Sequence, residues 1–287
     1  MIEEIRPIQP DATLFPGAQL TMVTTSIAAG NTNGQLWRAA DAGADTDTDT
    51  EQIYLLWDQG NNVFYLAGGA SPDAIRTMAA QIDGAIRQAA LQQRLIYFKI
   101  HPLTPALAAA IPDLFHNIPL HEMHKRFYRF EQEAAPVLSA AVDGVHYRRI
   151  DAAFLGEQHG NIEAVRGEVA WMWASPAAFQ AHGFGSAALV GDVIVCWCTA
   201  EYVSARMCGI GIETVPEFQG KGIATATAAH FVGECLRRGI VPHWECDGQN
   251  VGSVRVAEKV GFQILQKSRV WGGNFQNNGG KHAETNE

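Results

Sequence analysis

The stretch from Pro216 to Ala224 reads Pro-Glu-Phe-Gln-Gly-Lys-Gly-Ile-Ala and has the residue types and spacing that bind an anion. Gly220 and Gly222 have no side chains to keep a ligand away from the backbone. A helix beginning directly after them would point its free N–H groups and the positive end of its dipole at the same place. We therefore predict a pyrophosphate-binding site at this turn.

This turn differs from two familiar phosphate loops. In a Walker loop a Ser or Thr follows the Gly-Lys pair, whereas Gly222 follows Lys221 here. The opening G-x-G-x-x-G of a dinucleotide fold is also missing. Gly183 and Gly185 form a second glycine pair, but they precede a predicted strand instead of following one. Neither a Walker loop nor a dinucleotide loop is therefore predicted.

Two motifs together resemble those of the GNAT acetyltransferase superfamily. The first, residues 219–224 (Gln-Gly-Lys-Gly-Ile-Ala), is similar to the superfamily's Q/R-x-x-G-x-G/A loop. The second begins with Asn250-x-x-Ser253 and closes with residues 258–262, Glu-Lys-Val-Gly-Phe. The motifs occur in the expected order and separation, and the likeness covers roughly residues 144–275.

A narrower likeness lies between the two motifs. Cys235-Leu236-x-x-Gly239, followed by Pro-His-Trp-Glu-Cys at 242–246, resembles the branch that contains the zwittermicin A resistance acetyltransferase. Members of that branch carry an additional N-terminal domain of similar size. This likeness would account for the first half of the chain.

The resemblance implies that the chain binds acetyl-coenzyme A as an acyl donor. The pyrophosphate would lie on the backbone N–H groups from Gln219 through Thr225, and the pantetheine arm would pair like an extra strand with Thr214 and Val215. Asn250 would contact the cofactor arm, a role compatible with capping a helix. The implied cofactor-binding residues are Thr214, Val215, Gln219, Gly220, Lys221, Gly222, Ile223, Ala224, Thr225, Asn250 and Ser253.

Such a fold catalyses direct acyl transfer, in which an amine attacks the thioester in a ternary complex. Glu213 is the candidate base, because it lies on the strand beside the thioester and a half-buried carboxylate can have a raised pKa. Strand alternation leaves open whether Glu213 faces the cleft. The backbone N–H of Thr214 or Val215 would stabilise the oxyanion. Three other carboxylates are reserve candidates for the base: Glu201, Glu245 and Asp247.

The chain departs from the superfamily at Ala257, where many members have a tyrosine that protonates the leaving thiolate. A thiolate whose thiol has a pKa of about 8.5 leaves without obligatory protonation. We therefore predict an N-acetyltransferase acting on a primary amine of a small molecule, and the alternative is a module that binds acyl-coenzyme A without turnover. Ser253 is either a water-mediated proton donor or an ordinary early-helix serine. Lys221 either reaches a phosphate or stays in solvent.

Strands and a helix must position these residues in the second half of the chain. Tyr147 to Ile150 is a predicted strand, and helical and loop material follows to about Gln180. Residues 184–215 form a predicted three-stranded meander with turns at 190–193 and 203–206. Its last strand, Cys208 to Val215, leads through the glycine-rich turn into a helix from Gly222 to Arg238 and then a strand from His243 to Cys246.

The sequence of the first half predicts an α/β domain and contains no functional motif that we can recognise. Ile53 to Trp57 and Val63 to Ala67 flank a turn and form a predicted hairpin. Ser71-Pro72 starts a predicted helix that ends near Arg94, residues 95–100 are a predicted strand, and Thr104-Pro105 starts a helix that stops near Pro112.

The length of 287 residues predicts two domains. We expect an α/β (α+β) fold, with a smaller α/β N-terminal domain at 1–143 whose role is unknown; shaping the acceptor pocket is our hypothesis for it. A catalytic domain at 144–275 has a mixed, mostly antiparallel sheet flanked by helices, and a flexible tail covers 276–287, with fraying from Gly272. The Asp-Thr stretch 45–50 is expected to be a loop, and residues 131–144 connect the domains.

Composition excludes several classes of protein. A net charge of −9 argues against a nucleic-acid binder. An apolar content of 47% without a long uninterrupted apolar run, and a start without a secretory signal, predict a soluble cytoplasmic protein that does not interact with membranes. We expect a monomer or homodimer whose partner is a small-molecule amine.

No metal site is predicted. The five cysteines fit buried, reduced thiols, and Cys196 and Cys198 alternate on one strand without a second pair to complete a zinc site. His121 and His124 are expected to share a helix face with Glu122 between them, but their spacing is not H-E-x-x-H.

Overall fold

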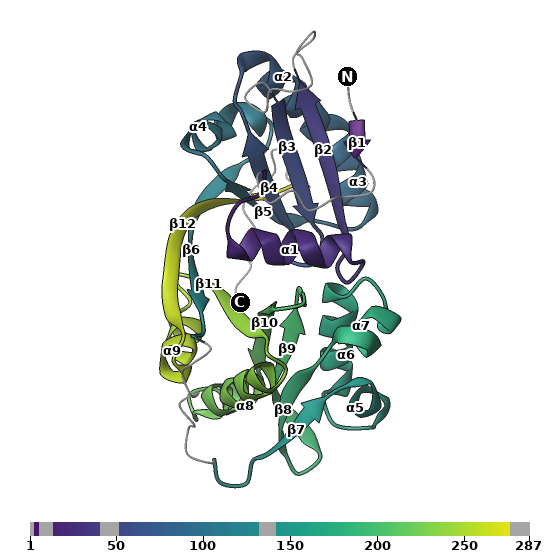
Figure 1. Ribbon diagram of the computed structural model, residues 1–287, viewed down its shortest axis with the longest axis vertical. Helices are drawn as coiled ribbons and strands as arrows, with labels where there is room; N and C mark the ends of the chain where they lie inside the picture. Colours follow the sequence, from purple (N-terminus) through teal and green to yellow (C-terminus); the bar gives the residue numbers. More distant parts are fainter. Residues whose placement is uncertain (1–2, 6–13, 41–51, 132–141, 276–287) are drawn as a thin grey trace. The chain divides into compact units, whose positions relative to one another are not determined.

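The computed structural model describes residues 3–5, 14–40, 52–131 and 142–275 (Figure 1). The chain divides into two compact units. The described part of unit 1 falls within Met1–Ile8, Gly34–Met123 and Arg269–Glu287, and that of unit 2 within Gln9–Asn33 and His124–Ser268. The units are therefore not the sequential halves that a boundary near Asp143 would give, because the chain passes from one unit to the other more than once.

Unit 1 contains a mixed sheet in the order β1-β2-β3-β4-β5-β12 (Figure 1). Neighbouring strands are antiparallel except for the parallel pair β4 and β5. The predicted hairpin is confirmed, since β3 and β4 pair from Asp58↔Val63 outward. The strand bounds are β1 (Glu3–Ile5), β2 (Gly34–Ala40), β3 (Gln52–Asp58), β4 (Val63–Gly68), β5 (Tyr97–Pro102) and β12 (Gln263–Asn274), of which only the end belongs to unit 1.

The helices of unit 1 begin where the sequence predicts. The first helical run consists of α2 (Pro72–Gln81), a π-helical turn (Ile82–Ile86) and α3 (Arg87–Gln92), and the second is α4 (Pro105–Leu114). Ser71 and Thr104 cap the two runs, each accepting a hydrogen bond from a first-turn N–H at 3.2 Å. Phe64, Phe98 and Phe275 pack edge to face or tilted in the core of this unit.

In unit 2 the strands follow one another along the sheet in the order β6-β11-β10-β9-β8-β7. Its neighbouring strands are also antiparallel except for one pair, β10 and β11. The predicted meander is confirmed, with turns between β8 and β9 and between β9 and β10. The strand bounds are β6 (Leu120–Arg129), β7 (His146–Ile150), β8 (Gly185–Val190), β9 (Val193–Glu201), β10 (Met207–Thr214) and β11 (Val241–Asp247).

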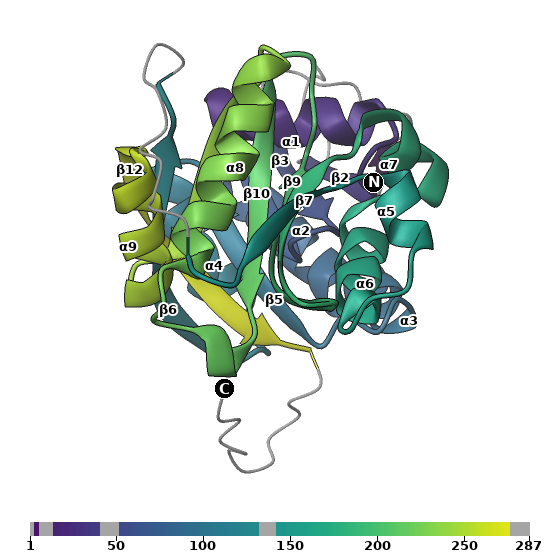
Figure 2. The same ribbon diagram turned by 90° about the horizontal axis from the view of Figure 1, so that it is seen from below.

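Helices cover both faces of the sheet in unit 2. The long helix α8 lies along β8, β9 and β10, as Figure 2 shows, and its Ile223 packs with Cys196 of β9. Helix α6 lies on the other face, because its Glu168 contacts Trp197, which alternates with Cys196. The helix bounds are α1 (Ala18–Ala28), α5 (Ala152–Gly156), α6 (Ile162–Met172), α7 (Pro176–His182), α8 (Ile223–Arg237) and α9 (Val251–Val260).

The two units have the same order of strands and helices, but the last strand of each series pairs in the other unit. In each unit, two antiparallel hairpin steps lead through a helical crossover to a parallel strand and then to a further helix. The next strand along the chain then pairs in the other unit: residues 125–129 of β6 pair with β11, and residues 271–274 of β12 pair with β5. Helix α1 likewise belongs to unit 2, where Asn31 beyond its end donates from Nδ2 to the Val203 carbonyl at 3.1 Å.

Strands β6 and β12 correct two sequence-based expectations. His121 and His124 lie on strand β6 and not on a helix, so their separation of three residues places them on opposite faces. The chain does not fray from Gly272, because β12 continues to Asn274 and Phe275 is fully buried. Long-range pairing explains both results, since neither strand has a partner close to it in the sequence.

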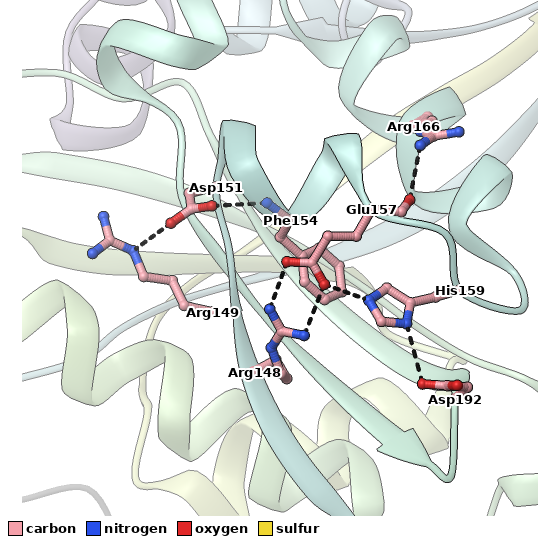
Figure 3. A network of polar contacts seen from close by, with 8 residues as sticks. All are labelled: Arg148, Arg149, Asp151, Phe154, Glu157, His159, Arg166 and Asp192. Atoms are coloured by element: carbon pink, nitrogen blue, oxygen red, sulfur yellow. Dashed lines mark hydrogen bonds and ion pairs between the residues drawn. The ribbon is translucent and has the colours of Figure 1, made fainter.

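A polar network holds the segment after β7 in place (Figure 3). Arg148 donates two hydrogen bonds to the Glu157 carboxylate at 2.8 and 2.9 Å, and His159 contacts the same carboxylate at 3.0 Å. The hydrogen bonds from the Arg148 guanidinium and, to a smaller extent, the contact with His159 lower the pKa of Glu157 to about 2. At the start of α5, Asp151 accepts the Phe154 N–H at 3.0 Å. These contacts fix the path of the chain from β7 to α6.

Three sequence-based expectations fall outside the described residues. They concern the loop at 45–50, most of the connection at 131–144 and the tail at 276–287. Within the described ranges, no helix is long and apolar enough to cross a membrane.

Candidate functional site

Strands β10 and β11 diverge in unit 2. Their parallel ladder contains only Met207↔Val241 and Cys208↔Pro242, although β10 continues to Thr214 and β11 to Asp247. On its other side, β10 stays paired with β9 along residues 209–214. Beyond Cys208, the edge of β10 that faces away from β9 is therefore open to an extended ligand.

Backbone alternation decides which N–H groups lie on this open edge. The Val215 N–H donates to the Val195 carbonyl of β9 at 2.9 Å. In an antiparallel ladder the neighbouring residue directs its N–H and C=O to the opposite side, and the Thr214 carbonyl indeed accepts Gln219 Nε2 at 3.1 Å. Of the two expected oxyanion donors, Thr214 therefore has its N–H on the open edge, whereas that of Val215 is already used in the sheet.

A cleft of about 450 Å³ lies beside this edge. It is formed by β10, the turn before α8, the first turn of α8, one indole ring of β11 and one face of α9. All the residues implied in cofactor binding line it except Val215 and Lys221. The residues lining it are Ile212, Thr214, Phe218, Gln219, Gly220, Gly222, Ile223, Ala224, Thr225, Trp244, Asn250, Gly252, Ser253, Arg255, Val256 and Lys259.

The start of α8 leaves its backbone donors free. Gly222 is the N-cap, with φ +82°, and it provides no side chain to bond the first-turn N–H groups. Gly220 also has a positive φ, +74°, so both positions favour glycine. The corresponding helix of unit 1, α2, differs because Ser71 accepts a first-turn N–H and Pro72 has none. The first-turn N–H groups of this helix are therefore left without a side-chain cap in unit 2, whereas the corresponding helix of unit 1 is capped.

Asn250 and Ser253 are joined by hydrogen bonds at the start of α9. Asn250 Oδ1 accepts the Ser253 N–H at 2.9 Å, so the side chain caps the helix. Trp244 Nε1 donates to Ser253 Oγ at 3.0 Å. The serine hydroxyl is therefore held by β11. Ala257, one turn further on, is fully buried and brings no proton donor to the cleft.

The charged groups at the cleft differ from those expected. Lys221 does not line it and instead lies over the Phe218 ring, with Nζ 4.9 Å from the ring centroid. Arg255 and Lys259 of α9 do line it, and no acidic side chain is among the lining residues. With Gly252 and Val256 they have the spacing i, i+3, i+4 and i+7 of one helix face. That spacing after the Asn250 cap is a signal for this face that the sequence already contains.

Glu213 lies on the opposite face of β10 from the cleft. Ile212 and Thr214 line the cleft, so alternation directs the exposed Glu213 side chain to the other face. Glu168 of α6 is on that face, where it accepts hydrogen bonds from Trp197 Nε1 and Thr199 Oγ1, both at 2.5 Å. Burial raises the pKa of Glu168. Glu168 could not be singled out from the sequence, because no local pattern relates α6 to β9.

The reserve carboxylates divide between two roles. Glu201 is near Glu168, because a Cβ placed on Gly211 would lie 2.5 Å from a Glu201 oxygen and 2.7 Å from a Glu168 oxygen. Glu245 instead forms an ion pair with Lys125 at 3.6 Å. Asp247 accepts the Gln249 N–H at 2.8 Å and shapes the turn before α9. Only Glu201 therefore belongs with Glu213 and Glu168.

The cysteines are confirmed as free, buried thiols. Cys196 accepts a hydrogen bond from Thr214 Oγ1 at 3.2 Å, which fixes the threonine side chain beside the open edge. Among the described residues, no group of three His, Cys, Asp or Glu side chains is arranged to bind a metal ion.

Known proteins are similar to this chain over most of its length. The family model described as GNAT acetyltransferase matches residues 12–270. An uncharacterized N-acetyltransferase of Bacillus subtilis (strain 168), YdfB, is 28% identical over 152 residues, which are 53% of this chain and 57% of that protein. The match to this curated relative therefore spans little more than half of the relative's length.

Two solved structures share the fold. A GCN5-related N-acetyltransferase-like protein from Streptococcus suis 89/1591 aligns with a TM-score of 0.61 and 16% identity, over 91% of this chain and 96% of that chain. A GCN5-related N-acetyltransferase from Sphaerobacter thermophilus aligns with a TM-score of 0.51 and 14% identity, over 85% and 81% of the two chains. At these identities the likeness concerns the fold alone, and it confirms the expected fold class.

Proposed function

The chain belongs to the GNAT acetyltransferase family, and we propose that unit 2 binds acetyl-coenzyme A and transfers its acetyl group to a primary amine of a small molecule. One observation carries this proposal. The uncapped N-terminal turn of α8 and the unpaired edge of β10 border the same cleft. A ligand that joins a pyrophosphate to an extended amide-containing arm matches both features.

The residues of the cleft match the parts of coenzyme A in turn. The N–H groups of Ile223, Ala224 and Thr225 would hold the pyrophosphate. The open edge of β10 would hydrogen-bond the amides of the pantetheine arm as an added strand does. Asn250, which both caps α9 and lines the cleft, would contact that arm.

The Thr214 N–H would stabilise the oxyanion that forms when the amine attacks the thioester carbonyl, because it is directed to the open edge. Coenzyme A supplies the activated acetyl group: a C–N bond forms, the C–S bond breaks and a thiolate leaves. Glu213 or Glu168 would accept the amine proton on the other face of β10. Glu213 lies next to Thr214 in the chain, and burial raises the pKa of Glu168 in the direction that suits a base at neutral pH.

The proposed reaction is tested by thiol release. The chain is incubated with acetyl-coenzyme A and, one by one, with polyamines, aminosugars and amino-antibiotics. A hit is then repeated with Glu213→Gln and with Glu168→Gln. We expect the variant of the true base to lose turnover at neutral pH with little change in coenzyme A affinity. Unchanged turnover in both variants would remove this face of β10 from the mechanism.

Ala257 supports a second candidate function, binding of acyl-coenzyme A without turnover, because its buried methyl group supplies no acid to the leaving thiolate. The same assay separates the two functions. Binding of coenzyme A without thiol release for any amine favours the binding module, and absence of binding rejects both.

Finer predictions rest on this result. The likeness of residues 235–246 to the zwittermicin A resistance branch predicts an amino-antibiotic among the acceptors. A role of the N-terminal residues in shaping the acceptor pocket, and a monomeric or homodimeric state, also stay predictions.

A further inference from the structure

We propose that Arg255 and Lys259 bind the 3′-phosphate of coenzyme A and make the site selective for coenzyme A over its dephospho form. This inference rests on the proposed function, because it names the part of the donor that these two side chains recognise. Neither residue belongs to the glycine-rich turn that receives the pyrophosphate.

The charge of the cleft is the first observation. The protein has a net charge of −9, yet the charged side chains that line the cleft are both cationic, Arg255 and Lys259. Both are exposed, and neither forms an ion pair with an acidic residue in the described part of the chain. Their positive charge is therefore available to an anionic ligand.

The arrangement on α9 is the second observation. Arg255 and Lys259 are four residues apart, so they stand on neighbouring turns of the same face and repel each other. Glu258, the acidic residue between them in the chain, faces elsewhere and contacts Arg126 at 3.9 Å and Tyr128 Oη at 3.4 Å. An anion placed between the two cations would relieve their repulsion.

The rigidity of α9 is the third observation. Asn250 caps its start, Gly261 ends it with φ +111°, and Val254, Ala257 and Val260 are buried on its inner face. The backbone positions that carry the two cations are thus fixed relative to the N-terminus of α8, which borders the same cleft. The ligand must present a phosphate group separate from its pyrophosphate. Coenzyme A has one on the ribose, and dephospho-coenzyme A lacks it.

Affinities for coenzyme A and dephospho-coenzyme A, measured by calorimetry at one ionic strength, test the proposal on the full chain. For the wild type we expect coenzyme A to bind about tenfold more tightly or better, the effect of charge-assisted hydrogen bonds to one phosphate. In Arg255→Gln/Lys259→Gln the ratio should fall to about one, through weaker binding of coenzyme A only. Each single variant should give an intermediate ratio.

A matched control removes a positive charge elsewhere. Lys267→Gln, on β12 and outside the cleft, should keep the wild-type ratio. A wild-type ratio near one, or an unchanged ratio in the double variant, overturns the inference and leaves the proposed function intact. If the wild type binds neither ligand, the proposed function fails and the inference fails with it. Unchanged dephospho-coenzyme A affinity in the double variant shows that its cleft is still folded.

Discussion

Replacing Phe130 with alanine should destabilise unit 2, although Phe130 lies before the boundary that the sequence suggests. The ring is fully buried directly after β6, and its N–H donates to the Pro242 carbonyl of β11 at 3.1 Å. It packs edge to face on Phe262 at 5.4 Å, and Phe262 packs on Trp244 at 5.5 Å. Trp244 in turn holds Ser253 in the cleft.

The size of the effect follows from this burial. Truncation of a buried Phe to Ala costs about 3–5 kcal/mol, including the cavity it leaves. Loss of an edge-to-face aromatic pair accounts for about 0.5–1.5 kcal/mol of such a change. We expect the free energy of unfolding to fall by about 4 kcal/mol for Phe130→Ala and by about 1 kcal/mol for Phe130→Leu, which keeps most of the volume.

Urea unfolding followed by tryptophan fluorescence measures the stability, and calorimetry with coenzyme A measures the affinity of the protein that remains folded. Phe130→Ala should also weaken coenzyme A binding, because Trp244 and Ser253 lose their support. The matched control is Phe98→Ala in unit 1, where the ring is equally buried but packs on Phe115 and Phe275. It should lose comparable stability without an intrinsic change in affinity.

Two results would refute the reasoning. One is a loss below about 1 kcal/mol for Phe130→Ala, since a well-packed buried ring cannot be removed so cheaply. The other is a fragment of residues 144–287 that folds and binds coenzyme A as tightly as the full chain. Such a fragment lacks the β6 residues that pair with β11 from His243 to Asp247.

Three further predictions concern single residues. Gly222→Ala should lower the free energy of unfolding by about 1–2 kcal/mol, because φ is +82° there, and it should also weaken coenzyme A binding. The control Gly239→Ala, at φ +68° and away from the cleft, should lower the stability without changing the affinity. Asn250→Ala should cost about 1 kcal/mol in urea unfolding, and Asn250→Asp should restore the cap to Ser253; equal losses for both variants would contradict the capping role. Burial and, to a smaller extent, the charge of Arg129 lower the pKa of His243 to about 4. As the pH falls, the unfolded chain therefore protonates this histidine before the folded protein does. The free energy of unfolding should be intact above about pH 6.5, fall by about 3 kcal/mol toward pH 4, and fall less in His243→Gln.

Local signals in the sequence identified the elements whose partners are close in the chain. The hairpin of β3 and β4, the capped helices after Ser71 and Thr104, and the meander of β8, β9 and β10 all follow from turn residues and periodicity. Strand β6 was missed because its partner in the sheet, β11, is more than a hundred residues away. A local pattern of histidines therefore looked helical.

In the candidate site, too, some features follow from the local sequence and others only from packing. Glycine at positions 220 and 222 is required by positive φ, a property of the residue type that the sequence displays directly. The position of Glu168 beside Thr199, and that of Arg255 and Lys259 beside the start of α8, depends on how helices pack on the sheet. Side chains on separate elements become neighbours only through packing.

The sequence by itself determined the family motifs, the glycine-rich turn and the helix that begins after it, because these depend on backbone freedom and local hydrogen bonds. Only the tertiary structure decided that Thr214 and not Val215 has its N–H on the open edge, that Glu213 faces away from the cleft, and that β6 and β12 exchange between the units. The physical reason is that strand register, the divergence of β10 from β11 and the choice of sheet partner are set by contacts between residues far apart in the chain.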